Sequence, residues 1–116
     1  MLDDITSVTA HTALDGLAMR QRVTADNIAN IETPGFLAGR VSFEDNLRKA
    51  VADGAPADTK FLNRRSLEPT RVNGNNVNLD HETLTHIDTN LRYQLMLRVL
   101  DGKISILRTA IGGAGA

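Results

Sequence analysis

Hydrophobic residues recur at intervals of three and four in two long segments, one near each end of the chain. The first segment covers about residues 4–30 and the second about residues 81–111. This spacing places the apolar side chains on one side of an α-helix. The sequence therefore predicts two terminal helices, each on the order of 40–45 Å long at a rise of 1.5 Å per residue. Gly16 weakens the first helix locally, so we expect packing to hold it in place.

The second terminal helix carries apolar residues on more than one side. Met96, Leu97 and Ile106 lie beside its main row, which consists of Leu84, Ile87, Leu91, Leu95, Val99, Leu100, Ile104, Leu107 and Ile111. A helix that is apolar on more than one side needs more than one neighbour to cover it. Because a chain of 116 residues offers few neighbours, we expect other subunits to supply some of them.

The expected fold class is mainly α. The two terminal helices would form an elongated, antiparallel, coiled-coil-like hairpin, and the short irregular middle segment would contain one short helix. Asp80 is the expected N-cap of the second long helix, and Glu82 would complement the positive end of its dipole. The predicted organisation has three parts: residues 1–35 form a helix and a Pro-Gly turn, residues 36–79 the middle segment, and residues 80–116 a helix with a flexible tail.

Turn-forming residues divide the middle segment. Ser42 is a candidate N-cap for the short helix, which Gly54-Ala55-Pro56 would end. Beyond this helix, residues 58–77 are expected to be extended or looped. Asn73-Gly74 is a candidate tight turn, but its flanking segments are too short to predict a hairpin with it.

An uncommon string of residues marks the end of the first helix. Asn27 and Asn30 are three residues apart and therefore share one helix face. Pro34 disfavours a helical conformation in the residue before it, and Gly35 suits the positive φ of a type II turn. The sequence predicts a sharp turn here, directly followed by an aromatic residue. The complete motif is Asn27, Ile28, Ala29, Asn30, Thr33, Pro34, Gly35 and Phe36.

This motif resembles the N-terminal signature of bacterial flagellar rod and hook proteins, which read Asn-Ile-Ala-Asn, a short linker, Thr-Pro-Gly and an aromatic residue. Segments 73–80, 90–94 and 102–104 are similar to the proximal rod proteins of that family. The resemblance implies a structural subunit of the proximal rod of the flagellar basal body, part of the drive shaft for motility. It also implies helical assembly through the terminal helices.

The resemblance further implies partners and a location. The partners would be other copies of the chain, other flagellar rod proteins, the ring and adaptor proteins at the rod base, and the flagellar type III export apparatus. The subunit would lie in the rod of the basal body, within the periplasmic space. Residues 1–4 show neither the positive charge nor the apolar run of a secretory signal, so we expect export without a cleaved signal peptide.

Two sets of residues are candidates for contacts between subunits. Asn90, Tyr93 and Gln94 lie roughly together on the second helix and would form a polar interface, since tyrosine is favoured at interfaces and this chain has one. The expected apolar assembly seam consists of Leu14, Leu17, Ile28, Leu84, Ile87, Leu91, Leu95, Leu100, Ile104 and Leu107.

Composition narrows the possible functions. The absence of cysteine excludes disulfide and thiolate chemistry. A net charge of −1 and an aromatic content of 3% give no reason to expect a nucleic-acid partner. No run of 18 apolar residues is present, so we expect no direct membrane insertion.

Candidate chemistry is equally sparse. His81 and His86 are five residues apart, which differs from the spacing of four used by helical metal-binding pairs. We therefore expect no catalytic residues, no metal, no cofactor and no enzymatic activity. The alternative to a rod subunit is a small soluble helical adaptor or export-chaperone-like binding module, which would use the same apolar faces in a closed dimer.

Overall fold

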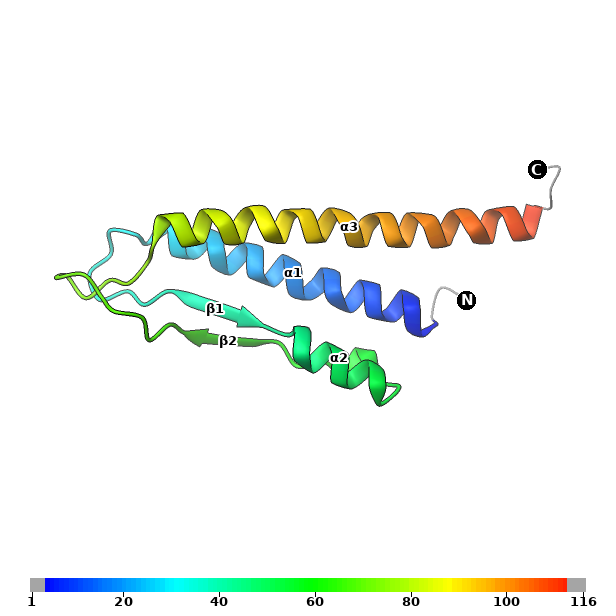
Figure 1. The fold of residues 1–116 in the computed structure, drawn as a ribbon, viewed down its shortest axis with the longest axis horizontal. Helices are drawn as coiled ribbons and strands as arrows, with labels where there is room; N and C mark the ends of the chain where they lie inside the picture. The colour runs from blue at the N-terminus through cyan, green and yellow to red at the C-terminus, as the bar shows by residue number, and fades with distance from the viewer. Residues whose placement is uncertain (1–3, 113–116) are drawn as a thin grey trace.

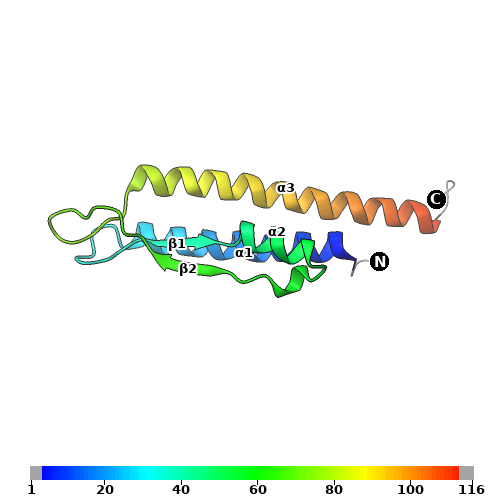
Figure 2. The same cartoon turned by 60° about the horizontal axis from the view of Figure 1, so that its bottom comes forward.

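The computed structural model describes residues 4–112, which form an elongated and thin molecule measuring 66 × 29 × 14 Å. Helix α1 (Ile5–Ala29) and helix α3 (Leu79–Gly112) run antiparallel and side by side (Figure 1). The middle segment packs against α1, which lies between it and α3 in Figure 1. In Figure 2 the middle segment and α1 overlap, and both lie below α3. The predicted fold class of two long terminal helices and a short middle segment is confirmed.

An ion pair joins α1 and α3 near the N-terminus of α1. The Asp4 side chain caps α1 by accepting a hydrogen bond of 2.9 Å from the N–H of Ser7. Lys103 of α3 pairs with the same carboxylate, and its ammonium group holds the pKa of Asp4 below the usual range. Beyond Lys103, α3 continues to Gly112 and extends past the first residue of α1 (Figure 1).

The middle segment folds into a small mixed layer. Strand β1 (Gly39–Ser42) pairs antiparallel with β2 (Leu62–Arg65), with Gly39 opposite Arg65 and Ser42 opposite Leu62. Helix α2 (Glu44–Ala52) and the short 3-10 helix η1 (Pro56–Asp58) lie between the strands in sequence. This sheet was not predicted, because strands of four residues are too short to show a clear alternation of apolar and polar positions.

Both predicted N-caps are wrong. Ser42 is the last residue of β1, and α2 begins at Glu44 without a side-chain cap. Helix α3 begins at Leu79, one residue before Asp80, and the Asn78 side-chain oxygen accepts a hydrogen bond of 3.1 Å from the N–H of His81. The pairing of Ser42 with β2 and the position of Asn78 just outside α3 explain these differences.

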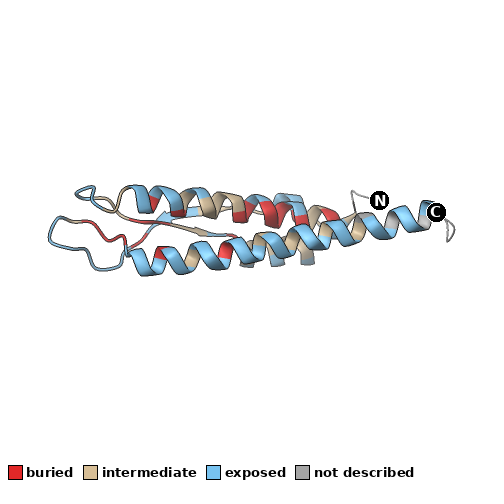
Figure 3. Cartoon of the chain, turned by 90° about the horizontal axis from the view of Figure 1, so that it is seen from above, coloured by how far each residue is buried: buried red, intermediate tan, exposed pale blue. Residues whose placement is uncertain are grey.

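The core is centred on α1, which carries several of the buried segments in Figure 3. Leu14 and Leu17 are among its buried residues. Gly16 allows the ring of Phe43 to lie against the helix, since a Cβ atom at Gly16 would come within 2.7 Å of ring carbons. Phe61 packs edge-on against Phe43, with ring centroids 5.6 Å apart. The glycine that weakens α1 locally is therefore the site where the middle layer packs onto it.

Arg20 of α1 fixes the start of α2. Its guanidinium group donates two hydrogen bonds to the Glu44 carboxylate, at 2.6 and 2.7 Å, and one to the carbonyl of Val41 at 2.9 Å. The guanidinium carbon also lies 5.0 Å from the centroid of the Phe43 ring. This arginine lowers the pKa of Glu44 to about 2.

Helix α3 packs mainly on α1 and uses a largely polar side to do so. Glu82 and Thr89 are fully buried on that side, and Tyr93, Met96 and Leu100 are half-buried along the same line. The rest of α3 is exposed over most of its length (Figure 3). Of the main apolar row recognised in the sequence, Leu84, Ile87, Leu91 and Leu95 therefore lie on the outside of the molecule, whereas Leu100 lies on the side that packs on α1.

Candidate functional site

The motif at the end of α1 forms the predicted sharp turn. Gly35 has a φ of +73°, and the N–H of Phe36 donates to the carbonyl of Thr33 at 3.2 Å. The Asn30 side chain donates to the Asp26 carbonyl at 2.8 Å and accepts from the Thr33 hydroxyl at 3.0 Å. The helix therefore ends in a closed turn in which both Asn30 and Thr33 participate through their side chains.

Asn75 joins this turn to the loop that precedes α3. Its buried amide nitrogen donates to the carbonyls of Asn30 and Thr33, both at 2.8 Å. Its amide oxygen accepts from the N–H of Val77 and from the Arg71 guanidinium, also at 2.8 Å each. Both donors and both lone pairs of the amide are thus used, which satisfies a polar group that is fully buried.

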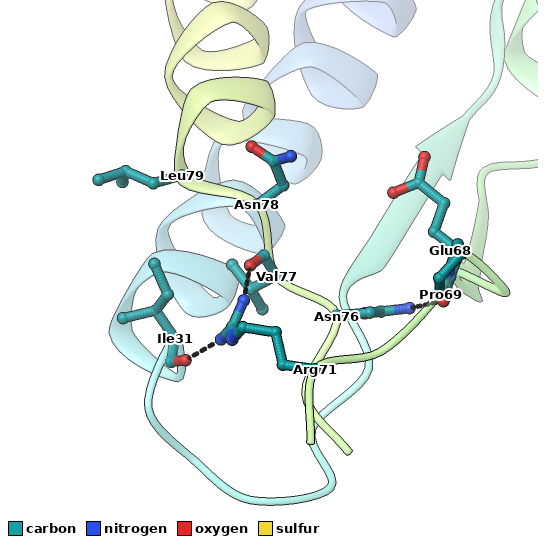
Figure 4. Close-up of a pocket in the computed structure, with 8 residues that line it drawn as sticks. All are labelled: Ile31, Glu68, Pro69, Arg71, Asn76, Val77, Asn78 and Leu79. Atoms are coloured by element: carbon teal, nitrogen blue, oxygen red, sulfur yellow. Dashed lines mark hydrogen bonds between the residues drawn. The ribbon is translucent and has the colours of Figure 1, made fainter. Parts of the chain in front are cut away.

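Arg71 and Asn76 continue the same set of bonds (Figure 4). The Arg71 guanidinium donates to the carbonyls of Ile31 at 2.6 Å and Val77 at 2.5 Å. Asn76 accepts from the N–H of Ala38 at 2.7 Å and donates to the carbonyl of Glu68 at 3.1 Å. The loop before α3 is therefore bonded to the end of α1 and to the start of β1.

Asn27 makes the corresponding link from α1 to β1 and α3. Its amide bonds both the N–H and the carbonyl of Gly39, at 2.8 and 3.0 Å, and also donates to the Glu82 carboxylate at 2.5 Å. Gly39 has no room for a side chain, because a Cβ atom would lie 2.7 Å from Val23. Arg40 donates to both oxygens of the buried Glu82 carboxylate, at 2.9 and 3.1 Å.

We call these side chains the polar clasp, which consists of Asn27, Arg40, Arg71, Asn75, Asn76 and Glu82. The clasp bonds four parts of the chain to one another: the end of α1, the start of β1, the loop before α3 and the first turn of α3. Among the described residues, one nitrogen of the Arg40 guanidinium has no hydrogen-bond partner and lies 3.8 Å from a Glu68 carboxylate oxygen. The other bonds of the network tie distant segments together, and such a network rigidifies the structure and specifies one arrangement. The clasp thereby fixes the angle and register at which α3 leaves the loops and packs on α1.

The outer side of α3 carries the second feature, which we call the apolar row. It consists of Leu84, Ile87, Leu91 and Leu95, whose exposed fractions are 68%, 51%, 62% and 55%. Contiguous exposed apolar surface on a soluble chain marks a site of interaction. The clasp sets which side of α3 faces outward, and it therefore controls the presentation of this row.

The remaining predicted residues are spread over the molecule. Leu14 and Leu17 lie in the core, Leu100 is half-buried, and Ile28 is 36% exposed. Ala29, Thr33 and Pro34 are exposed, whereas Phe36 is half-buried under the Arg65 guanidinium. Asn90 and Gln94 are exposed and Tyr93 is half-buried. The side chains of Ile104 and Leu107 lie outside the part of the chain that the structure describes.

Sequence reasoning missed most of the clasp. Asn27 was identified as part of a motif, but its partners Arg40 and Glu82 were not connected with it. One signal in the sequence is the high density of asparagine in residues 73–78. A loop that contacts only water has no need for so many amide side chains. The pairing itself joins residues 27 and 82, which no local pattern relates.

Comparison with known proteins agrees with this arrangement. The family model described as "Flagella basal body rod protein" matches residues 8–36, which span most of α1 and the turn. A flagellar basal body rod protein FlgB from Borreliella burgdorferi is 35% identical over 112 residues, covering 78% of this chain and 83% of that protein. The chain belongs to the FlgB family of flagellar basal body rod proteins.

Other members of the FlgB family give similar values. The protein of that name from Escherichia coli is 32% identical over 113 residues, covering 79% of this chain and 82% of its own length. The FlgB protein from Bacillus subtilis is 29% identical over 114 residues, covering 87% of this chain and 88% of its own length. Membership in this family identifies the chain as a structural subunit of the basal body rod, and the comparisons offer no support for the adaptor alternative.

None of the helices that the structure describes has the length and apolar character needed to span a membrane. Within residues 4–112, no three acidic or histidine side chains are grouped so that they could bind a metal ion.

Proposed function

We propose that the chain is a subunit of the proximal rod, at the base of the flagellar drive shaft, and that it assembles helically through α1 and α3. The observation that carries this proposal is the apolar row on α3. These four leucine and isoleucine side chains have no use within the subunit, because α3 packs on α1 with a different side. A subunit that repeats through a heterologous contact would cover such a row at every step.

The shape of the molecule supports the same role. A subunit 66 Å long and 14 Å thick buries little surface of its own and offers two long faces to its neighbours. We assign the apolar row, together with Ile104 and Leu107, to the seam between subunits, whereas Leu100 packs toward α1 within the subunit. Asn90 and Gln94, which are exposed, would add polar contacts along it, and the predicted third member, Tyr93, lies half-buried on the side facing α1. Leu14 and Leu17 stabilise the subunit itself.

The clasp has a distinct part in this proposal. Helical assembly requires every copy to present α3 in the same orientation, since a tube repeats one geometry many times. Asn27 and Glu82 would supply that uniformity by fixing the start of α3 against the end of α1. This role is structural and requires no catalysis, metal or cofactor.

We also infer where the subunit lies and how it reaches that place. Export through the flagellar type III apparatus, without a cleaved signal peptide, would bring the subunit to the periplasmic space. There it would contact ring and adaptor proteins at the rod base, further rod proteins and other copies of itself. The described surface includes an open groove between the loops and α3, lined by Ile31, Pro69, Val77 and Leu79, which is available for such a contact (Figure 4).

A complementation experiment tests the proposal. A strain lacking the chain would receive the wild type, Leu91→Asp or the control Thr83→Asp, which adds the same charge to an exposed site on another side of α3. We expect Leu91→Asp to abolish swimming and to leave the rod fraction without the chain, because a charge would enter the seam. Swimming by the Leu91→Asp strain as fast as by the Thr83→Asp strain would contradict the assignment of the seam.

A further inference from the structure

The outer side of α3 contains a feature that the single subunit does not explain. Gly102 lies within the helix, where glycine is less favourable than alanine by about 1 kcal/mol. A Cβ atom at this position would meet no atom of the described residues within 4 Å, so nothing inside the subunit requires a glycine. Helical periodicity places Gly102 in line with Leu84, Leu91 and Leu95 of the apolar row.

A glycine in line with large apolar residues lets a second helix come close at that point. The arrangement along α3 is also symmetric about the level of Tyr93. If a second copy of α3 runs antiparallel about this level, Leu91 lies opposite its Leu95 and Ile87 lies opposite its Val99. In the same register Leu84 of one copy lies opposite Gly102 of the other, so that a large side chain meets a position without a side chain.

The charges along α3 favour the same direction. The first part of the helix exposes Asp80 and Asp88, whereas the later part exposes Arg98 and Arg108 against Asp101. Two further basic residues are already paired within the subunit, Arg92 with Asp88 and Lys103 with Asp4. Two parallel copies would place like charges together. Two antiparallel copies would place the acidic end of one helix beside the basic end of the other, which is the complementary arrangement.

We propose that the free subunit covers its apolar row by pairing α3 with α3 of a second copy, antiparallel and centred at the level of Tyr93. The contact would extend about 27 Å from Leu84 to Gly102 at 1.5 Å per residue. A contact confined to one helix pair is small, so the dimer is expected to be weak and readily exchanged.

The geometry of this dimer gives it a regulatory consequence, which rests on the proposed function. An antiparallel pair uses the same surface on both copies and therefore closes, whereas a rod requires contacts that propagate. Pairing would keep the apolar row out of water before assembly and would prevent polymerisation in the wrong place. Incorporation into the rod would require the pair to separate.

The absence of cysteine from the chain allows a direct test. Purified Ile87→Cys and Val99→Cys subunits would be mixed at high micromolar concentration and oxidised, after circular dichroism has verified that both are folded. We expect the mixed disulfide to exceed both homodimers, because antiparallel pairing juxtaposes the two different positions. The control is a mixture of Thr83→Cys and Asp101→Cys, which are exposed on another side of α3.

Two results of this test would overturn the proposal. Predominant Ile87→Cys and Val99→Cys homodimers would show parallel pairing, and cross-linking no greater than that of the control mixture would show that the row does not pair. A second measurement uses sedimentation velocity with Gly102→Leu. We expect this variant to retain its helix and to dimerise about tenfold more weakly than the wild type.

An unchanged dimerisation constant for Gly102→Leu, or a wild type that stays monomeric at every concentration, would also reject the dimer. These measurements use the purified chain alone, and the complementation experiment above uses the flagellum. A result that rejects the dimer can therefore be distinguished from a result that rejects the assignment to the rod.

Discussion

Replacing Glu82 with alanine tests the clasp most severely. The Glu82 side chain is fully buried and accepts three hydrogen bonds, two from Arg40 at 2.9 and 3.1 Å and one from Asn27 at 2.5 Å. Removing one partner from a buried ion pair costs about 3–5 kcal/mol. The Arg40 side chain is 29% exposed, so water would partly replace its lost partner and the lower end of this range applies.

We therefore expect Glu82→Ala to lower the free energy of unfolding by about 3 kcal/mol. In a domain of this size such a loss lowers the melting temperature by about 10–15 °C. The assay is thermal unfolding followed by circular dichroism at 222 nm. Glu82→Gln, which preserves the shape of the side chain but removes its charge, should melt at a temperature between those of Glu82→Ala and the wild type.

Asp80→Ala provides the matched control, since it removes the same charge from the same helical turn at an exposed position. It should change stability by less than about 1 kcal/mol. If Glu82→Ala melts within about 3 °C of Asp80→Ala, the clasp contributes less than about 1 kcal/mol and the reasoning is refuted.

Three further predictions concern single positions. Gly16→Ala should lower the free energy of unfolding by about 1–3 kcal/mol, because the added Cβ atom would meet the Phe43 ring. Gly102→Ala in the dilute subunit should raise the free energy of unfolding by about 1 kcal/mol. Thermal melts compare the two variants, and equal effects would contradict the packing at Gly16. Gly35→Ala should cost about 1–2 kcal/mol and Gly35→Val should block assembly, because φ is +73° and a side chain would be strained even in open space; a motile strain carrying Gly35→Val as its only copy would refute the turn argument. Glu44 has a lowered pKa when folded, so its stabilising contribution is present above pH 4.5 and is lost as the pH falls toward about 2. Urea midpoints at pH 7 and pH 3 should therefore differ more for the wild type than for Glu44→Gln, and identical pH dependence would show that the Arg20 contact is not stabilising.

The long helices could be predicted because their signal is local and repeated. The periodicity of α1 and α3 extends over many turns. Helix α1 ends at Ala29, and Pro34 with Gly35 predicts the sharp turn that follows it by covalent geometry. The ends of α2 and α3 were less accurate, because a cap depends on which of several polar residues points toward the helix. Asn78 and Asp80 are both acceptable caps by type, and the sequence does not distinguish them.

The clasp and the outward side of α3 depend on contacts between distant residues. Glu82 had a plausible local role at a helix N-terminus, and only the fold brings it to Asn27 and Arg40. Periodicity identified Leu84, Ile87 and Leu91 as one row, but it does not say whether that row faces α1 or a neighbour. Gly16 likewise weakens a helix by its propensity, and its value emerges only when Phe43 packs on it.

The measurement that tests the central claim most directly compares the accessibility of Leu91 in the free and assembled subunit. Leu91→Cys, or Arg48→Cys on α2 as a control, would be labelled with a maleimide in the dilute purified subunit and in isolated basal bodies. The account predicts that Leu91→Cys reacts in the dilute subunit and is protected in the rod fraction, whereas Arg48→Cys reacts in the free subunit. Equal labelling of Leu91→Cys in both states, or absence of the chain from the rod fraction, would contradict it.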